Sequence, residues 1–435
     1  MSSITVGILA IAILLLMLAV RVPIAFALAS VSVVGMLVIR GPAAAMSVLA
    51  EQPYNFIAHW SMSAVPMFIL MGTVAYHGGL TQSLYRAARL WLSSLPGGLA
   101  VASTAACAMF AAASGSSVAT ASAMGRIAIP EMLRYRYDPG LATGAVAAAG
   151  TLGSLIPPSI LMVLYAIFAE VSVSQALVAG VIPGILSAIM FATMIAIRCK
   201  LNPALAPPVE EDVSWADRWA VLAQVWPLPV LVLAVIGSMY VGIFTATEAA
   251  AGGALMTFVI VALRRGLNWR VIKESVVESV NSTATILFIA LGGFLLSRFM
   301  AVSGLPAYVA HVVDGMELHW LYIIIGASVV YIILGMFLDS IGIMLLTLPI
   351  MLPVLEAAHL NLIWFGVLVI KYLEIGLVTP PVGLNVFVIK SVVGKSVPLE
   401  TIFKGVMWFI VTDIVTLIIL ISFPQISLFL PNIMK

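Results

Sequence analysis

The sequence predicts an all-α polytopic membrane protein that contains an internal repeat. Of its 435 residues, 63% are hydrophobic and 9% are charged, and the mean hydropathy is +1.18. Soluble domains carry about 25% charged residues, so most of the surface of this chain must face lipid. Apolar stretches long enough for helices that span hydrocarbon recur from end to end. Two similar Pro-Pro segments, Gly150–Ile160 and Glu374–Leu384, interrupt these stretches.

Charge and cysteine content narrow the possible partners and the location. The net charge of +2 gives no indication of a nucleic-acid partner. Cys107 and Cys199 lie in or beside apolar stretches, so we expect small buried side chains and no disulfide. The apolar run that begins at Ile4 has no basic segment before it, and we expect a retained first helix instead of a cleaved signal peptide. The predicted environment is therefore the lipid bilayer.

The apolar stretches predict thirteen candidate spans, several of which are too long, too short or too broken to be simple helices. Two further stretches, Thr81–Gly98 and Asn268–Val280, place charged and apolar residues at helical spacing, so we expect interfacial amphipathic helices there. The spans are Ile4–Val20, Ile24–Ile39, Ser61–Tyr76, Leu99–Ala119, Leu141–Ala169, Leu177–Ile197, Ala220–Val241, Thr245–Leu263, Val280–Met300, Leu321–Leu338, Ile343–Leu355, Leu362–Ile389 and Phe403–Phe423.

A polar linker, residues 199–219, divides the chain into halves of similar length, residues 1–198 and 220–435. The linker is rich in proline and then in acidic residues, which is typical of a loop between membrane domains. We predict that each half contains scaffold helices, one helical hairpin and one broken helix. Most basic clusters favour an N-terminus outside the cell, although Arg40 would then lie on the wrong side.

The two Pro-Pro segments are the clearest sign of an internal duplication. They lie 223 residues apart, measured from Pro157 to Pro380. Interrupted helices at matching places in two repeats are typical of secondary transporters, in which they form the substrate and ion sites. Further pairs at the same interval are Ser116 and Asp339, Ser117 and Ser340, Ile127 and Ile350, Pro130 and Pro353, Gly153 and Gly376, and Pro158 and Pro381.

The prolines deprive four backbone carbonyls of their helical partners. An α-helical N–H bonds the carbonyl four residues earlier, and proline has no N–H. Unpaired carbonyls are costly in hydrocarbon unless they line a cavity or find another partner. We therefore expect converging carbonyls that bind Na⁺ at both places, while a simple packing kink remains the alternative. The affected carbonyls are those of Gly153, Ser154, Gly376 and Leu377.

The segments upstream of the prolines predict two re-entrant hairpin tips. Ser114–Ala123 is dense in hydroxyl groups and follows a helix of small residues, although small residues also simply ease close helix packing. Its counterpart is Phe337–Gly342, which places Asp339 in an otherwise apolar run. A carboxylate there indicates a functional site; the alternatives are a salt bridge or a helix end near water. Oxygens near the second break also come from Thr379, Gly383 and Asn385.

Other charged residues in apolar stretches allow more than one interpretation. Arg126 could attract an anionic substrate, or it could extend to the interface near Arg134. Glu248 could cap a helix or pair with a cation. Lys371 and Glu374 are spaced for an ion pair on one helix face.

Together these segments resemble the large membrane subunit of tripartite ATP-independent periplasmic (TRAP) transporters, the DctM-like permease family. The resemblance covers nearly the whole chain. One departure is Ala246, where the family often has proline. The segments that carry the resemblance, in order, are PMFILMG, SLPGGLA, SGSSVATASAMGRIAIPEM, GTLGSLIPPSI, GIFTATEAAA, GMFLDSIGIMLLTLPIMLP and EIGLVTPPVGLNVFV.

The resemblance implies a Na⁺-driven importer of small organic acids in the bacterial inner membrane. Family substrates are C4-dicarboxylates, sialic acid, other sugar acids and keto acids. The implied partners are a periplasmic substrate-binding protein and a small four-helix membrane subunit. The implied mechanism is an elevator motion of a transport domain across a scaffold, with Na⁺ as the coupling ion and with no transition metal or other cofactor.

The resemblance also implies where the ions and the substrate bind. Two ion sites are expected at the two hairpin tips and their matching breaks, with the substrate between them. The residues implied for Na⁺, through backbone or side chain, are Ser114, Gly115, Ser116, Ser117, Gly153, Ser154, Pro157, Asp339, Ser340, Gly376, Leu377, Thr379, Pro380 and Gly383. The residues expected at the substrate are Ser117, Arg126, Pro158 and Asn385.

Two other functions are compatible with a polytopic chain. The first is a stand-alone ion-coupled carrier of carboxylates that needs no binding protein. The second is an intramembrane enzyme, but the sequence contains no HExxH motif, no Gly-x-Ser-x-Gly motif and no aspartate pair at catalytic spacing. We therefore expect a transporter and not an enzyme.

Overall fold

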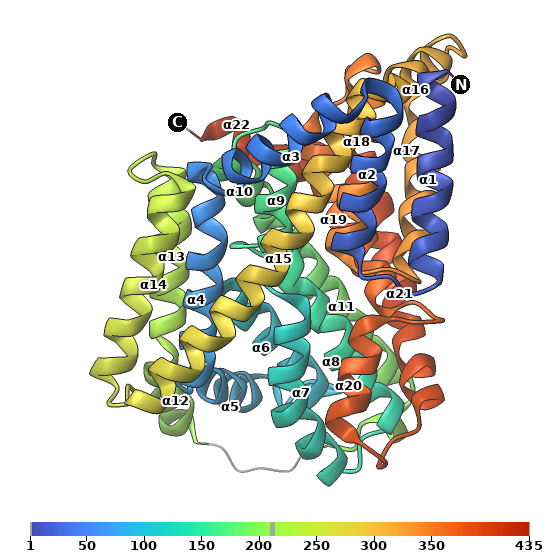
Figure 1. Cartoon of the computed structure of the whole chain (residues 1–435). Helices are drawn as coiled ribbons and strands as arrows, with labels where there is room; N and C mark the ends of the chain where they lie inside the picture. The colour runs from blue at the N-terminus through green and yellow to red at the C-terminus, as the bar shows by residue number, and fades with distance from the viewer. Residues whose placement is uncertain (1, 209–213, 435) are drawn as a thin grey trace.

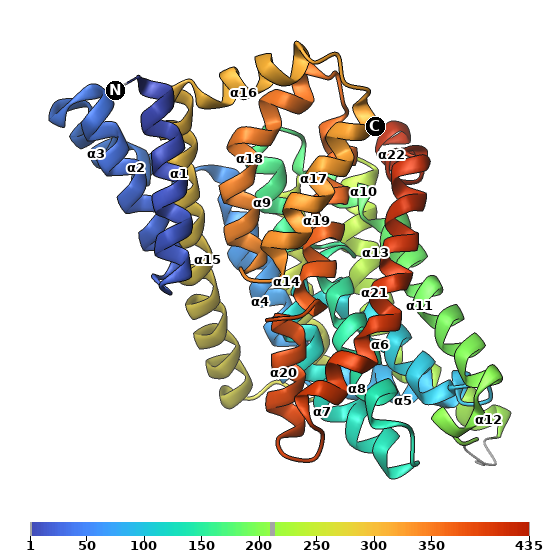
Figure 2. The same ribbon diagram turned by 90° about the vertical axis from the view of Figure 1, so that its right-hand side faces the viewer.

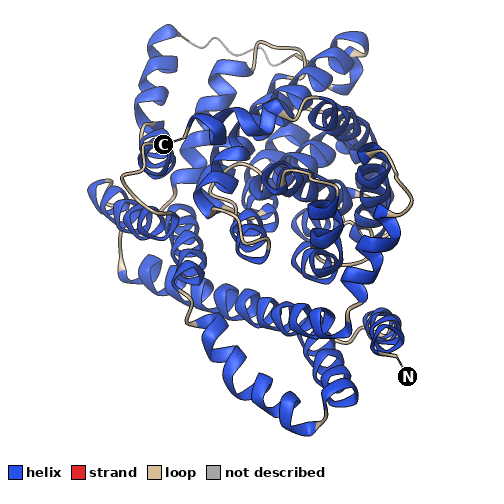
Figure 3. Cartoon of the chain, turned by 90° about the horizontal axis from the view of Figure 1, so that it is seen from above, coloured by secondary structure: helices blue, strands red, loops and turns tan. Residues whose placement is uncertain are grey.

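The computed structural model describes residues 2–208 and 214–434. Within these ranges the chain forms α-helices and short 3-10 helices and contains no strand (Figures 1 and 3). The predicted all-α fold class is confirmed.

The helices follow one another in the order of the printed sequence. Up to the linker they are α1 (Ser3–Ala19), α2 (Ile24–Arg40), α3 (Pro42–Ile57), η1 (Trp60–Ser63), α4 (Ala64–His77), α5 (Leu80–Leu92), α6 (Gly98–Ser114), α7 (Ser117–Arg134), α8 (Pro139–Thr151), η2 (Leu152–Ser154), α9 (Ile160–Phe168), α10 (Val173–Ala179), α11 (Val181–Leu201) and η3 (Pro203–Leu205). After it they are α12 (Trp215–Val225), α13 (Pro227–Tyr240), α14 (Ala246–Leu263), α15 (Trp269–Ser303), α16 (Leu305–Asp314), α17 (Trp320–Gly335), α18 (Ser340–Ala357), α19 (Leu362–Val378), α20 (Leu384–Val393), α21 (Leu399–Ser422) and α22 (Gln425–Ile433).

The first half contains a helical hairpin followed by a broken helix. Helices α6 and α7 form hairpin 1, whose tip is Gly115 and Ser116. Gly115 has a φ of +61°, a left-handed conformation that glycine adopts without steric cost. Helices α8 and α9 are separated by residues 152–159, which we call break 1.

The second half repeats this order of elements. Helices α17 and α18 form hairpin 2, and helices α19 and α20 are separated by residues 379–383, which we call break 2. The Pro157–Pro158 and Pro380–Pro381 peptide bonds are both cis. Figure 2 shows α6 and α7 in the lower part of the molecule and α17 and α18 in the upper part. The two hairpins therefore lie toward opposite ends of the molecule in this view.

A second group of helices flanks the hairpins and contains α1, α2, α4, α13, α14 and α15. The long helix α15 runs diagonally across this group and packs along α2 and α4 (Figure 1). It also contacts α18 of hairpin 2. A Cβ at Gly292 would lie 2.8 Å from the carbonyl oxygen of Ala25, so glycine allows α15 to approach α2 closely.

Helix α15 corrects one prediction. We expected Asn268–Val280 to be a separate interfacial helix, but it is continuous with the following span and forms one helix of 35 residues. Asn268 caps this helix by accepting a hydrogen bond of 2.9 Å from the N–H of Val271. No proline or glycine separates the two predicted segments, so nothing in the backbone ends the helix between them. The other predicted amphipathic segment does form a separate helix, α5, in which Leu84 is buried and Arg86 is exposed.

Several other boundaries differ from the predicted spans. The span predicted at 220–241 is bent by 44° at Trp226, because Pro227 begins a new helix. The span predicted at 99–119 ends at Ser114, at the tip of hairpin 1. The predicted linker 199–219 is helical at both of its ends, and its residues 209–213 lie outside the described ranges. Helices α3, α16 and α22 were not predicted.

Length and composition of the described helices agree with a membrane location. Five helical segments of at least 18 residues have an apolar window long enough to cross a bilayer, and up to seven spans result if each of two bent pairs is counted as one. The five segments are Val173–Leu201, Ala246–Leu263, Trp269–Ser303, Ser340–Ala357 and Leu399–Ser422.

Replacing Gly405 with alanine should destabilise the packing of α21 on α8. A Cβ at Gly405 would overlap the carbonyl oxygen of Gly140, and backbone atoms cannot move aside as a flexible side chain can. We expect a loss of about 1–3 kcal/mol, the usual cost of overpacking, measured as a lower unfolding temperature in detergent. Gly237→Ala is the matched control, because a Cβ there meets nothing within 4 Å. Equal stability of the two variants would contradict the close packing.

Candidate functional site

Both hairpins, break 1 and the helix ends on either side of break 2 meet at one cavity of about 190 Å³, which we call the tip cavity. The predicted residues that line it come from four separate stretches of the chain. They are Gly115, Ser116, Ser117, Ser154, Asp339, Ser340 and Leu377. The other lining residues are Val118, Ile160, Leu161, Ile286, Ile341 and Leu384.

Helix ends of both polarities converge on the tip cavity. The first residues of α7, α9, α18 and α20, which are Ser117, Ile160, Ser340 and Leu384, all line it. Free N–H groups give these N-termini a partial positive charge, which favours anions. The C-terminal ends of η2 and α19, at Ser154 and Leu377, line the same cavity, and the carbonyls at such helix ends favour cations. The cavity can thus accommodate a cation and an anionic group close together.

The two hairpin tips are built in the same way. Ser116 caps α7 by accepting a hydrogen bond of 3.4 Å from the N–H of Ala119. Asp339 caps α18 by accepting a hydrogen bond of 2.9 Å from the N–H of Gly342. Ser116 and Asp339 are also 223 residues apart, so the capping residues agree with the predicted repeat. The carboxylate of Asp339 consequently stabilises the start of a helix that points into the site.

The hydroxyl-rich tip of hairpin 1 is internally hydrogen bonded. The hydroxyls of Ser114 and Thr120 lie 2.7 Å apart, and the Thr120 hydroxyl lies 2.8 Å from the carbonyl of Ser116, to which it donates. Thr120 is buried and was not among the predicted site residues. Its place within the hydroxyl-rich stretch was the signal that could have identified it. These contacts hold the oxygens of the tip in fixed positions beside the cavity.

Each hairpin tip packs against the break of its own half. In the first half the N–H of Ile160 donates to the carbonyl of Gly115 over 3.3 Å, and in the second the N–H of Val382 donates to the carbonyl of Met336 over 3.2 Å. Glycines permit the contact in both halves. A Cβ at Gly153 would lie 2.6 Å from the carbonyl oxygen of Ser116, and one at Gly335 would lie 2.9 Å from the Cα of Gly376. The glycines at the breaks therefore serve close approach of backbones.

The structure corrects the prediction that all four carbonyls near the prolines lack partners. The carbonyl of Ser154 accepts a hydrogen bond from the hydroxyl of Ser159. The carbonyl of Gly376 accepts one of 3.2 Å from the N–H of Thr379, because the chain turns sharply there. Within the described ranges we find no donor for the carbonyls of Gly153 and Leu377. These two remain available to an ion.

Asn385 connects the second half to hairpin 1. Its fully buried side chain donates to the hydroxyl of Ser117 over 2.7 Å and to the carbonyl of Ala147 over 3.1 Å. Asn385 is not among the residues that line the tip cavity. The structure therefore brings it to Ser117, where it fixes the orientation of a hydroxyl that does line the cavity.

The other predicted site residues in the two breaks do not line the tip cavity. The carbonyl of Pro158 faces Gly115, and a Cβ there would lie 2.5 Å from it. The Thr379 hydroxyl donates to the carbonyl of Ile375 over 2.6 Å, and Gly383, with a φ of +57°, precedes α20. Pro157 and Pro380 lie within the two breaks.

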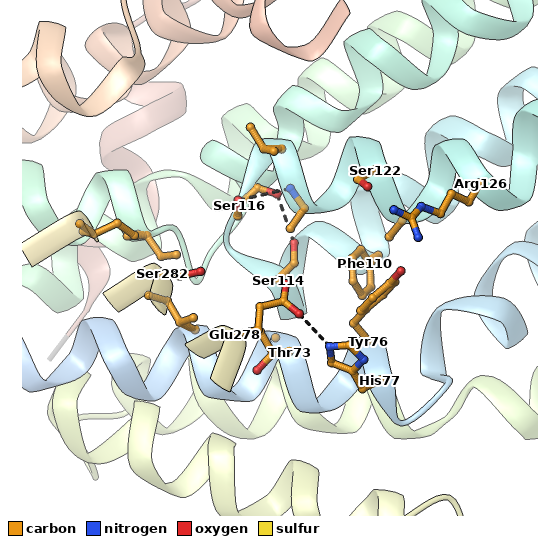
Figure 4. Close-up of a pocket in the computed structure, with 17 residues that line it drawn as sticks. Thr73, Tyr76, His77, Phe110, Ser114, Ser116, Ser122, Arg126, Glu278 and Ser282 are labelled. Carbon is orange, nitrogen blue, oxygen red and sulfur yellow. Dashed lines mark hydrogen bonds and ion pairs between the residues drawn. The ribbon is translucent and has the colours of Figure 1, made fainter. Parts of the chain in front are cut away.

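A larger cavity of about 510 Å³, which we call the side cavity, is shown in Figure 4 and shares lining residues with the tip cavity. Its walls come from α4, α6, α7 and α15, and Ser116, Val118, Ile160 and Ile286 line both cavities. Arg126 lines the side cavity from α7, together with Ser122. Among the described residues its guanidinium has no ion-pair partner. The interpretation of Arg126 as a contact for an anion fits this position.

Two other predictions on charged residues can be checked. Glu248 caps α14 in a reciprocal arrangement with Thr245, so the capping interpretation is confirmed. Lys371 and Glu374 form the predicted ion pair, with a distance of 2.9 Å. A third member of this group is Asp413 on α21, which lies 2.6 Å from the ammonium of Lys371. Sequence analysis did not identify Asp413 as part of the group. All three side chains are fully buried.

Sequence analysis also missed a charged cluster on the wall of the side cavity. His77 lies 2.7 Å from Glu278 and 3.4 Å from Glu274. The two glutamates are spaced four residues apart on α15, which puts them on one helix face. The spacing of the two glutamates could be seen in the sequence, but no sequence feature predicted that His77 lies beside them.

The described residues contain no group of three or more histidine, cysteine, aspartate or glutamate side chains placed to hold a metal ion. Oxygen atoms are instead the abundant ligands at the tip cavity. Hydroxyl, carboxylate and carbonyl oxygens suit hard cations such as Na⁺.

The chain is similar to known transporter subunits over most of its length. The chain is 34% identical over 386 residues to the C4-dicarboxylate TRAP transporter large permease protein DctM of Pseudomonas aeruginosa, with 88% of this chain and 89% of that protein covered. It is 30% identical to the ectoine TRAP transporter large permease protein TeaC of Halomonas elongata, with 93% and 94% covered. It is 28% identical to the sialic acid TRAP transporter large permease protein SiaM of Vibrio cholerae, with 88% and 89% covered.

Solved structures share the fold at low sequence identity. The YdaH transporter of Alcanivorax borkumensis matches with a TM-score of 0.60 and 13% identity, with 88% of this chain and 90% of that chain covered. MtrF of Neisseria gonorrhoeae matches with the same TM-score and identity, with 97% and 95% covered. At this identity the likeness shows that the chain shares their fold.

Residues 11–426 match the family described as the DctM component of tripartite ATP-independent periplasmic transporters. The relatives are named as permease components and not as enzymes. This agrees with the helical architecture and with the predicted location in the inner membrane. The chain therefore belongs to the DctM family of TRAP transporter large permease subunits.

Proposed function

We propose that the chain is the subunit through which a Na⁺ gradient drives the import of small organic acids. The observation that carries this proposal is the meeting of both hairpin tips, break 1 and the helix ends that flank break 2 at the tip cavity, beside a larger cavity lined by Arg126. Interrupted helices at matching places form the ion and substrate sites of many secondary transporters. The relatives named for C4-dicarboxylates, sialic acid and ectoine support an organic-acid cargo.

One Na⁺ binds at each hairpin tip in this proposal. The first ion contacts oxygens of Ser114–Ser117 and of Gly153 and Ser154, and the second contacts oxygens of Asp339, Ser340 and Leu377. Each set combines side-chain oxygens with carbonyls of a broken helix, and oxygen is the ligand that hard cations prefer. Binding would tie each tip to its break. The other residues proposed around the two ions are Pro157, Gly376, Thr379, Pro380 and Gly383.

The substrate carboxylate binds near Arg126 in the side cavity. A guanidinium presents several N–H donors in a planar arrangement that matches a carboxylate. The N-terminus of α7, which begins at Ser117, adds partial positive charge on the same side. Pro158 and Asn385 complete the proposed substrate contacts by shaping the tip around Ser117.

Transport follows an elevator motion in this proposal. The two repeat halves, residues 1–198 and 220–435 around the linker 199–219, each contribute a hairpin and a broken helix to the moving part. The helices beside them, with α15 along one wall of the side cavity, form the scaffold. A moving part that carries its cargo as a unit fits two hairpins that pack on their own breaks.

The proposed partners are a periplasmic substrate-binding protein, which delivers the acid, and a small four-helix membrane subunit, which packs beside the scaffold. This part of the proposal rests on membership of the DctM family. The alternative is a carrier that works without a binding protein.

Arg126→Gln should raise the apparent KM for the transported acid by about 10- to 100-fold. Loss of a hydrogen bond to a charged group costs about 1.5–3 kcal/mol, and each 1.4 kcal/mol is a factor of ten in affinity. The measurement is the initial rate of Na⁺-driven uptake into proteoliposomes that contain the complete system. Arg134→Gln is the control, because Arg134 is exposed at the C-terminal end of α7 and does not line the side cavity. An unchanged KM for the Arg126 variant would remove the residue from the substrate site.

A further inference from the structure

The side cavity has walls of different chemical character. Arg126 on α7 lines one wall and offers only donors. Glu278 and Ser282 on α15 and Thr73 on α4 line another (Figure 4). A substrate that fills the cavity therefore meets a guanidinium and, on a different helix, a carboxylate.

Glu278 belongs to a charged cluster with His77, Glu274 and Arg270. Arg270 lies 2.7 Å from Glu274, so these two charges offset each other. Glu278 accepts a hydrogen bond from the ring of His77 if Nε2 carries the proton. With a neutral imidazole Glu278 keeps its negative charge, and with an imidazolium the pair has no net charge. Lys273 lines a neighbouring cavity that also touches Glu278, but it does not line the side cavity.

The hydroxyl groups near Glu278 do not change the hydrogen-bond acceptor role of its carboxylate on the α15 wall of the side cavity. The hydroxyls of Thr73 and Ser279 lie 2.7 Å apart, and the Thr73 hydroxyl also lies 3.1 Å from the carbonyl of Leu70 and 3.3 Å from that of Ser275. Glu278 is about half exposed, with 49% of its side-chain surface accessible, so its carboxylate can reach a ligand in the cavity. A carboxylate at this place accepts hydrogen bonds and repels a second carboxylate.

We infer that the transported acid carries one carboxylate, bound near Arg126, and a hydroxyl or ammonium group at its other end, bound by Glu278. This rests on the proposed function and adds the substrate class to it. Plain dicarboxylates are disfavoured, because their second carboxylate would face Glu278. The volume of about 510 Å³ leaves room for acids with a chain of six carbon atoms. Glu278 is thus the residue that determines specificity at the scaffold side.

Two matched pairs of acids test this inference. Gluconate and glucarate differ only in a terminal hydroxymethyl or carboxylate group, and 4-aminobutyrate and glutarate differ only in an ammonium or carboxylate group. The measurement is equilibrium binding of each acid, in Na⁺ buffer, to the purified large and small membrane subunits together. The binding protein is omitted so that its own selectivity does not contribute.

In at least one pair the monocarboxylate should bind at least tenfold more tightly than the dicarboxylate. Glu278→Gln removes the charge and keeps the shape, so it should reduce that ratio at least threefold. Glu274→Gln is the control, because Glu274 also contacts His77 but lines only the neighbouring cavity, and it should leave the ratio unchanged.

Equal or tighter binding of the dicarboxylate in both pairs would overturn the inference, and so would a ratio that Glu278→Gln does not change. The inference is also overturned if none of the four acids binds while the complete system still imports another carboxylic acid with Na⁺. In that case the proposed function stands. If the complete system imports no carboxylic acid at all, the proposed function itself fails.

Discussion

Replacing Lys371 with methionine is expected to destabilise the chain by about 3–5 kcal/mol, the usual cost of removing one partner from a buried ion pair. The Lys371 ammonium lies 2.9 Å from Glu374, 2.6 Å from Asp413 and 3.1 Å from the hydroxyl of Ser187. All these side chains are fully buried. Without the lysine, two carboxylates would remain in an apolar interior with no cation between them.

The measurement is the free energy of unfolding of the purified chain in mixed detergent and denaturant. Lys404→Met is the control, because Lys404 lies exposed on the same helix as Asp413 and should change the stability by little. The triple variant Lys371→Met, Glu374→Gln, Asp413→Asn removes all three charges and should recover part of the loss. A single Lys371 variant as stable as the original chain would show that these groups do not form the buried network described here.

Gly115→Ala is expected to reduce the Na⁺ affinity of the chain at least tenfold. Gly115 has a φ of +61°, which costs an alanine about 1–2 kcal/mol. The added Cβ would also lie 2.5 Å from the carbonyl oxygen of Pro158, a backbone atom of break 1. The tip of hairpin 1 would have to move away from the break, and the oxygens proposed to surround the ion would separate.

The measurement is the Na⁺ dependence of uptake by the Gly115→Ala variant. Gly304→Ala is the control. Gly304 also has a positive φ, +69°, but a Cβ there meets nothing within 4 Å, so this control carries only the conformational cost. Gly304→Ala should keep its Na⁺ dependence. If Gly115→Ala keeps it too, the contact between hairpin 1 and break 1 is not part of an ion site.

The repeat and the breaks could be predicted because they depend on local chemistry. The adjacent prolines of each half mark the place where its helix is interrupted, and a polar residue ahead of an apolar run marks a helix start. Ser116 and Asp339 therefore stood out in the sequence, and both cap helices in the structure. Residues of both tips line one cavity in the structure, while an ion or substrate site there stays a prediction.

Other parts of the site depend on contacts between distant residues. Sequence analysis could not foresee that Ser159 and Thr379 would satisfy two of the carbonyls near the prolines, because this depends on the path of each break. His77 and Glu278 are 201 residues apart, and only the packing of α4 on α15 brings them together. The third partner of Lys371, Asp413, belongs to another helix for the same reason.

The central claim is best tested by uptake of labelled sialic acid, gluconate, malate and succinate into proteoliposomes under an imposed Na⁺ gradient. The chain would be reconstituted with its small subunit and binding protein, and each partner would then be omitted in turn. We predict uptake of at least one acid that requires the Na⁺ gradient and both partners, and that stops when K⁺ replaces Na⁺. Uptake that persists without Na⁺ would contradict the ion sites, and uptake by the chain alone would contradict the proposed partners.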